Sequence, residues 1–151
     1  SIAGIEINIS CPNVKEGGME FGKDTRLSAQ VVKAVRKSFN GHLMVKLSPS
    51  AGDIAAVALA CEAEGADSLS LINTIPAMAI DIEARKPKLS TVKGGLSGPA
   101  IRPIALRMVY EVAEKVKKPV VGIGGIAQAE DALEAIRRNQ VFGRVLIDCT
   151  G

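Results

Sequence analysis

The chain has 151 residues, of which 47% are hydrophobic, and a formal net charge of +3. This length accommodates one domain with a hydrophobic core, whereas dispersed basic residues and an aromatic content of only 3% argue against a nucleic-acid surface. The three cysteines (Cys11, Cys61 and Cys149) are odd in number and widely spaced, which argues against a disulfide framework and a zinc site.

Hydropathy gives no indication of a membrane protein. The apolar runs are far shorter than the roughly 20 residues that cross a bilayer, and the N-terminus lacks the basic-then-apolar order of a signal peptide. We therefore expect a cytoplasmic protein without a membrane partner.

Strand and helix patterns alternate through the first half of the chain. The periodicity predicts, in this order, a strand over 5–9, a helix over 26–39, a strand over 43–47, a helix over 53–64 and a strand over 68–72. Residues 73–100 interrupt this order with prolines, charges and the stretch KGGLSGP. We expect a loop there, longer than packing requires, and loops of that length are usually functional or disordered.

The alternation resumes after this loop. It predicts a helix over 102–117, a strand over 119–123, a helix over 130–138 and a last strand over 141–147. No hairpin pattern interrupts the series, which indicates a parallel α/β sheet or barrel. A barrel of eight units needs about 250 residues and this chain supplies about four and a half units. It is therefore a piece of a larger domain, an assembling half-barrel or a short open sheet.

Polar or glycine residues follow strand after strand. They are Ser10-Cys11-Pro12-Asn13, Ser48-Pro49, Asn73-Thr74 and Gly124-Gly125. In parallel α/β folds the ligand lies at the C-terminal ends of the strands, so we expect the functional site at this edge.

Cys11 lies between two asparagines at the end of the first predicted strand. The amides of Asn8 and Asn13 can offer donors and acceptors to a planar polar ligand, and a thiolate beside them can act as a base if its pKa is lowered. The alternative interpretation makes Cys11 a small buried hydrophobe and the asparagines turn formers.

Three further features each have two interpretations. Lys46 interrupts an apolar strand and should point to a ligand or a partner charge, or else to solvent. We favour the ligand because its neighbours read as buried on both sides. The turn at 122–125 is either part of a phosphate-binding turn or a plain tight turn, and Ala127 leaves the dinucleotide fingerprint incomplete. The glycines of 94–98 either approach a flat ligand or form a flexible loop.

The remaining chemically notable residues are interpreted as structural. His42 is expected at the surface, without a partner that would make a triad or a metal site. Cys61, Met44 and Met108 are expected to pack in the core.

The motifs NISCPNVKEGGMEFG, VKLSP, INT, GGLSGPAIRPIAL and GIGGI occur in this order. As an ordered series they resemble the catalytic subunit of class 1B dihydroorotate dehydrogenase, from about Ile5 to about Ile136. The resemblance implies that residues 1–151 form a single partial domain of an FMN-binding (β/α)₈ TIM barrel, about strands 4 to 8 and incomplete at both ends. Its site would lie at the C-terminal strand ends.

The resemblance also implies a reaction, the oxidation of dihydroorotate to orotate in de novo pyrimidine (UMP) biosynthesis. Cys11 matches the family's general base, which removes a proton from C5 while hydride passes from C6 to N5 of FMN. The substrate-binding residues would be Asn8, Asn13, Asn73 and Thr74. The FMN-binding residues would be Asn8, Lys46, Ile72 and Gly98, with Gly124 and Gly125 at the phosphate. No metal site is implied.

In the family a second subunit that carries FAD and an iron–sulfur cluster passes the electrons to NAD. The resemblance therefore implies homo- and hetero-oligomers. Neither nucleic acid nor a membrane is among the implied partners.

The chain also departs from the family pattern. The first three strand and helix units are absent, and RRNQVFGRVLIDCTG places Leu146 and Ile147 where a Gly-Thr pair is expected. One alternative is the flavin domain of dihydropyrimidine dehydrogenase, which shares the Ser-Cys-Pro start, although CPNVKEGG and DIEARKP look more like the dihydroorotate enzyme. Another is a non-catalytic truncated remnant or interaction fragment, whose open edge strand favours self-association.

Overall fold

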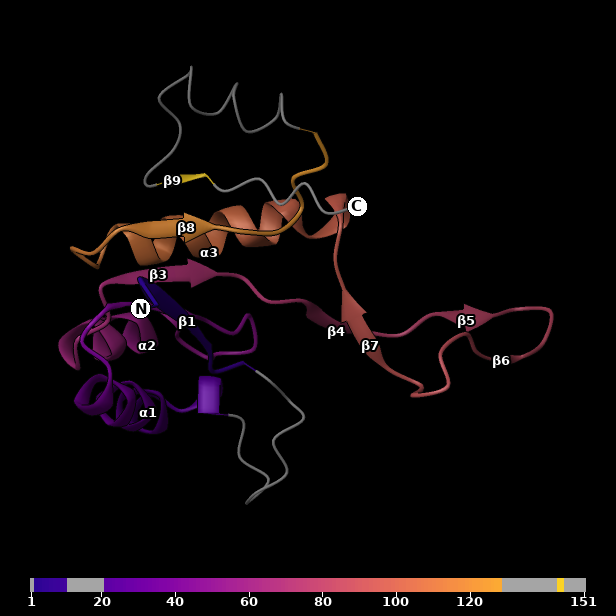
Figure 1. Ribbon diagram of the computed structural model, residues 1–151. Helices are drawn as coiled ribbons and strands as arrows, with labels where there is room; N and C mark the ends of the chain where they lie inside the picture. Colours follow the sequence, from indigo (N-terminus) through magenta and orange to yellow (C-terminus); the bar gives the residue numbers. More distant parts are fainter. Residues whose placement is uncertain (1, 11–20, 129–143, 146–151) are drawn as a thin grey trace.

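The computed structural model describes residues 2–10, 21–128 and 144–145 and shows a parallel sheet with helices (Figure 1). The sheet has five strands in the order β1-β2-β3-β8-β9. Their bounds are Gly4–Asn8 for β1, His42–Lys46 for β2, Ser68–Leu71 for β3, Val120–Gly122 for β8 and Arg144–Val145 for β9. The parallel α/β class expected from the sequence is confirmed, and the described residues form no closed barrel.

The strand register brings the C-terminal strand ends to one edge. Asn8 pairs with Lys46 and Lys46 with Ser70, while Leu71 pairs with Gly122. Because all these pairs are parallel, the residues that follow β1, β2, β3 and β8 leave the sheet side by side.

Three α-helices pack against one face of the sheet. They are α1 (Thr25–Ser38), α2 (Ile54–Ala63) and α3 (Arg102–Ala113), with short 3₁₀ turns η1 (Phe21–Lys23) and η2 (Pro99–Ile101). The carboxylates of Asp24 and Asp53 cap α1 and α2, each accepting from a backbone N–H at 2.9 Å. Helix α3 ends at Ala113, one turn earlier than predicted.

The hydrophobic core lies between these helices and the sheet. Its fully buried members come from both layers: Val32, Leu43, Val45, Leu47, Val57, Cys61, Leu69, Leu71 and Val112. Along β2 the burial alternates, because Leu43 and Val45 are buried while His42 is exposed and Lys46 is only half-buried. Val45 and Leu47, the neighbours of Lys46, are both fully buried, as expected, while Lys46 itself lies on the less buried face of the strand.

Residues 75–96 form an arm rather than the expected loop. β4 (Ile75–Ala77) pairs antiparallel with β7 (Gly94–Leu96), and β5 (Ile80–Asp81) pairs with β6 (Lys86–Pro87). Figure 1 shows this arm projecting from the side where β3 ends. The strands are only two or three residues long, too short for an alternating pattern to reveal them.

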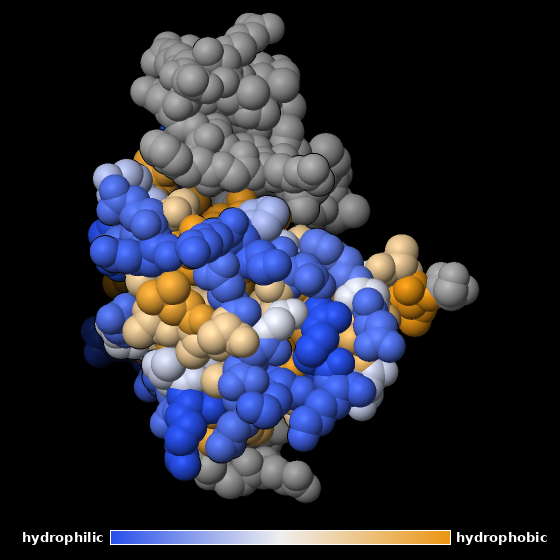
Figure 2. Space-filling model, turned by 90° about the vertical axis from the view of Figure 1, so that its left-hand side faces the viewer, coloured by the Kyte–Doolittle hydropathy of each residue, from blue (hydrophilic) through white to orange (hydrophobic). Residues whose placement is uncertain are grey.

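The opposite end of the sheet, where the strands begin, lies away from the arm (Figure 1). Figure 2 looks onto the side where the strands begin, and this surface is mostly hydrophilic with small hydrophobic patches.

The predicted helix over 130–138 lies outside the described residues, whereas β9 falls within the strand predicted over 141–147. Within the described residues, no helix has the length and apolar character needed to span a membrane.

Candidate functional site

A polar cluster joins the ends of β1 and β3. The Asn8 Oδ1 accepts from the Ser10 backbone N–H at 3.1 Å, from the Ser10 hydroxyl at 2.5 Å and from the Asn73 Nδ2 at 3.3 Å. The Asn73 Nδ2 also donates to the Ser10 Oγ at 2.5 Å. The two asparagines predicted as ligand-binding residues on different strands are therefore brought together, with Ser10 as the bridge.

Thr74 extends this cluster toward the arm. Its backbone N–H donates to the Asn73 Oδ1 at 2.8 Å, which fixes the amide plane of Asn73. Gly95 of β7 lies against Thr74 so closely that a Cβ at position 95 would be 2.2 Å from the Thr74 Oγ1. The arm therefore meets the cluster at a point where only glycine fits.

Ile72 and the β8 loop are tied together beside the cluster. Ile72 is 2% exposed, and its N–H donates to the Ile123 carbonyl at 3.0 Å. The Ile123 N–H donates to the Leu71 carbonyl at 2.6 Å. These bonds continue the pairing of β3 and β8 and fix where the following glycine turn starts.

The glycine turn after β8 has two consecutive residues with positive φ. Gly124 and Gly125 have φ values of 106° and 78° in the left-handed region, and a Cβ on Gly125 would be 2.5 Å from the Arg102 Cα. Within the described residues, the N–H groups of Gly124 and Gly125 donate to no protein acceptor. Two adjacent backbone donors without a protein acceptor suit a phosphate.

The other predicted site residues are placed as follows. Lys46, the last residue of β2, is half-buried at the edge between Asn8 and the β3 end. Gly98 has a φ of 84°, and a Cβ there would contact nothing within 4 Å. Cys11 and Asn13 lie outside the described residues, so their roles remain predictions.

The face of the sheet away from the helices carries polar contacts that the sequence did not predict. The Ser70 hydroxyl donates to the Glu6 Oε1 at 2.5 Å, and the His42 Nε2 lies 2.7 Å from the Ser68 Oγ. The available indication was the SLSL pattern of β3, which places both serines on one face. His42 is exposed, as expected.

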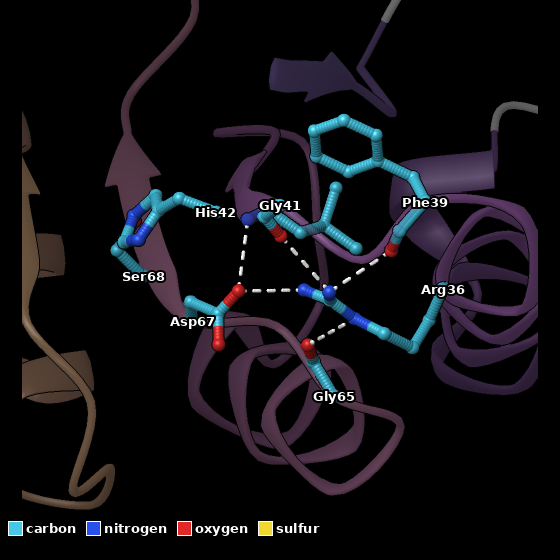
Figure 3. Close-up of polar contacts among 8 residues, drawn as sticks. Arg36, Phe39, Gly41, His42, Gly65, Asp67 and Ser68 are labelled. Atoms are coloured by element: carbon cyan, nitrogen blue, oxygen red, sulfur yellow. Dashed lines mark hydrogen bonds and ion pairs between the residues drawn. The ribbon is translucent and has the colours of Figure 1, made fainter. Parts of the chain in front are cut away.

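Among the described residues three titratable groups have shifted pKa values, and Cys61, Asp67 and Tyr110 all lie away from the strand ends that form the site. The hydrogen bond to Glu114 raises the pKa of the Tyr110 hydroxyl on α3. Complete burial in α2 raises the pKa of the Cys61 thiol to about 12, which confirms its place in the core. At the N-terminal ends of β2 and β3, the Leu43 amide and then the Arg36 guanidinium hold the pKa of Asp67 below its ordinary value, against partial desolvation. Figure 3 shows Asp67 and Arg36 with their hydrogen-bond partners, which connect α1 to the segments before β2 and β3.

The arrangement at the strand ends can hold a ligand with two kinds of polar group. Amide side chains of Asn8 and Asn73 can pair with the edge of a planar polar ring. The ammonium of Lys46 and the open amides of the glycine turn can balance negative charge farther along the edge. A flavin mononucleotide, with a planar ring and a phosphate, fits this donor set.

Comparison with known proteins points the same way. Residues 2–138 match the sequence model of a family described as dihydroorotate dehydrogenase. The chain is 59% identical over 135 residues to the dihydroorotate dehydrogenase B (NAD(+)) catalytic subunit of Trichlorobacter lovleyi, covering 89% of this chain and 44% of that protein. It is 57% identical over 133 residues to the same subunit of Porphyromonas gingivalis, covering 88% and 43%. The chain thus spans less than half the length of these relatives.

Proposed function

Because this chain belongs to the dihydroorotate dehydrogenase family, we propose that it supplies part of the site of an FMN-dependent enzyme that oxidises dihydroorotate to orotate. The observation that carries the proposal is the meeting of Asn8, Ser10 and Asn73 at the strand ends, within the stretch that matches the family. In the same proposal the five-stranded sheet is a portion of a (β/α)₈ barrel, about strands 4 to 8. One-sided helix packing supports this, because barrel helices lie outside the strands.

The proposed residues hold the substrate or the cofactor, and Asn8 contacts both. Asn8 and Asn73, with Asn13 and Thr74, hold the pyrimidine through amide and hydroxyl hydrogen bonds. The cofactor-binding residues are Asn8, Lys46, Ile72 and Gly98 at the ring, and Gly124 and Gly125 at the phosphate.

The proposed chemistry divides between the protein and the cofactor. Cys11, as the thiolate, takes the proton from C5 of dihydroorotate, and the electron pair of that C–H bond forms the C5–C6 double bond. FMN, when bound, accepts the hydride that leaves C6. The amides of Asn8 and Asn73 orient the pyrimidine ring.

The relatives are named catalytic subunits of an NAD(+)-linked enzyme, which supports a partner protein. We propose that electrons pass from FMN to a subunit carrying FAD and an iron–sulfur cluster, and from there to NAD, in a homo- and hetero-oligomer. The proposed pathway is pyrimidine biosynthesis in the cytoplasm.

The test is an anaerobic visible absorption spectrum of the full chain with FMN, before and after dihydroorotate is added. Bound flavin that is bleached by dihydroorotate is the expected result, and Cys11→Ser should retain the flavin while bleaching slows by at least about 100-fold. The matched control is Cys61→Ala, a thiol in the core that should leave bleaching unchanged. A chain that binds no flavin would be an inactive remnant, and the proposed function would be wrong for these 151 residues.

A further inference from the structure

Two side-chain amides and one hydroxyl at the strand ends form a chain of hydrogen bonds that runs in one direction. The Asn73 Nδ2 donates to the Ser10 Oγ at 2.5 Å, and the Ser10 hydroxyl donates its single proton to the Asn8 Oδ1, also at 2.5 Å. Asn73 lies just beyond the end of β3, and Ser10 lies just beyond the end of β1. Ser10 therefore accepts from one strand end and donates to the other.

A backbone N–H fixes the direction at each end of this chain, because a backbone N–H can only donate. The Ser10 N–H donates to the Asn8 Oδ1 at 3.1 Å, so the oxygen of the Asn8 amide faces Ser10. The Thr74 N–H donates to the Asn73 Oδ1 at 2.8 Å, which leaves the nitrogen of Asn73 to face the hydroxyl. A hydroxyl can accept from that nitrogen and donate to that oxygen at once, so it connects the two amides in these orientations.

The direction of the bonds determines which amide atoms stay open to a ligand. Within the described residues, the Asn8 Nδ2 donates to no protein acceptor, and the Asn73 Oδ1 accepts only from Thr74. Asn8 is exposed and Asn73 is half-buried, so a ligand can reach both amides. The pair therefore offers a donor from Asn8 and an acceptor from Asn73, which complements a ring edge with a carbonyl next to an N–H.

We propose that Ser10 is a positioning residue that determines which ring edge the site selects. Its hydroxyl holds the Asn8 amide as a donor and the Asn73 amide as an acceptor. The inference rests on the proposed function, in which these two amides hold the pyrimidine. An amide that turns over exchanges donor for acceptor with almost no change of shape, so each lost hydrogen bond makes the opposite orientation easier to reach.

Two ligands with opposite edges test this role. Orotate presents a carbonyl next to an N–H, whereas its 4-amino analogue, cytosine-6-carboxylate, presents an amino donor next to a ring-nitrogen acceptor. Titration of the flavin spectrum of the full chain with FMN measures both dissociation constants. We expect the unmodified chain to bind orotate at least about 100-fold more tightly than the analogue. Ser10→Ala should reduce this ratio about tenfold, because two hydrogen bonds that oppose rotation of the amides are lost.

Two control variants separate the hydroxyl from the substitution itself. Ser10→Thr keeps a hydroxyl and should keep the ratio within about twofold of that of the unmodified chain. Ser38→Ala removes an exposed hydroxyl from the last turn of α1 and should leave the ratio unchanged. A merely structural role of Ser10 would weaken the binding of both ligands alike and would not change their ratio.

The orientation of the amides can also be measured without flavin. In heteronuclear NMR spectra of the full chain, the side-chain amide protons of Asn73 are bonded, whereas those of Asn8 are open. The Asn73 protons should therefore exchange with water about fivefold more slowly than the Asn8 protons. Ser10→Ala should remove most of this difference.

Several outcomes would overturn the proposal. They are an unchanged ligand ratio in Ser10→Ala, a ratio that Ser10→Thr fails to restore, loss of bound flavin from Ser10→Ala alone, and equal exchange of the two amides in the unmodified chain. Failure of the unmodified chain to bind FMN would instead refute the proposed function. The exchange rates would then still decide whether Ser10 sets the orientation of the amides, so the two failures are distinguishable.

Discussion

The guanidinium of Arg36 makes four hydrogen bonds at the N-terminal end of the sheet, and its removal should destabilise the fold. The side chain leaves the last turn of α1 and donates to the carbonyls of Gly65, Phe39 and Gly41, each at 3.0 Å (Figure 3). It also donates to the Asp67 Oδ2 at 2.6 Å. These acceptors belong to the segments that lead into β2 and β3, so one side chain joins a helix to two strands.

The size of the loss follows from these contacts. A hydrogen bond to a neutral acceptor contributes about 1 kcal/mol and a charged one somewhat more. The side chains of Arg36 and Asp67 are 26% and 39% exposed, so water replaces part of what is lost. We expect Arg36→Met, which keeps the aliphatic stem, to lower the free energy of unfolding by about 2–3 kcal/mol.

Urea unfolding of the full chain, followed by circular dichroism, measures this difference. The matched control is Lys33→Met on the same helix, because Lys33 pairs with Glu64 at 3.1 Å while its side chain is 57% exposed. An exposed pair of this kind should contribute less than about 0.5 kcal/mol. Equal losses in the two variants would refute the reasoning that the carbonyl contacts of Arg36 hold the strand ends.

The carboxylate of Asp67 should make the free energy of unfolding decrease in acid. The folded pKa of Asp67 is lowered, so its contribution is complete above the unfolded pKa of about 3.9 and is lost as the pH falls through the folded value. Asp67→Asn should abolish this acid-dependent loss. Arg36→Met should only reduce it, because the Leu43 amide, the largest cause of the shift, still donates to the carboxylate.

Two further predictions concern close packing. Gly95→Ala should displace Thr74 and weaken dihydroorotate binding by about tenfold or more. Gly52→Ala is the control and should leave binding unchanged, because a Cβ at position 52 contacts nothing within 4 Å. Titration of the flavin spectrum with dihydroorotate measures both affinities. Cys61 is buried and its pKa is raised to about 12, so it should react with iodoacetamide only after unfolding. Mass spectrometry of the native and the denatured protein measures the labelling, and equal labelling of Cys61 in both would contradict the prediction.

Periodicity predicted the central strands and helices because burial on one face leaves a repeating pattern. The strand expected over 68–72 and the helix expected over 53–64 match β3 and α2 to within one residue at each end. The Asp53 cap and the glycine at position 65, with a φ of 101°, explain why α2 could be bounded so closely. Local chemistry sets these ends, so the sequence records them directly.

The arm and the Glu6–Ser70 contact could not be predicted for the opposite reason. The strands of the arm are too short to alternate, and their pairing joins β4 to β7 across an intervening hairpin. The bond from Ser70 to Glu6 joins residues 64 positions apart. Such contacts depend on strand order and register, which emerge only when the sheet has formed.

The candidate site depends both on local sequence motifs and on the order and register of the strands. Motif order brought attention to Asn8 and Asn73 individually, and Ser10 belongs to the same motif as Asn8, but the motifs do not show that Ser10 joins the two asparagines. The parallel register supplies this connection, because β1 and β3 flank β2 and end at the same edge. At the opposite end of the sheet the guanidinium of Arg36 joins the segments that lead into β2 and β3, so the polar groups of the candidate site are not needed to hold that end together. This separation explains how a cluster of polar side chains bonded mainly to one another can occupy one end of the sheet.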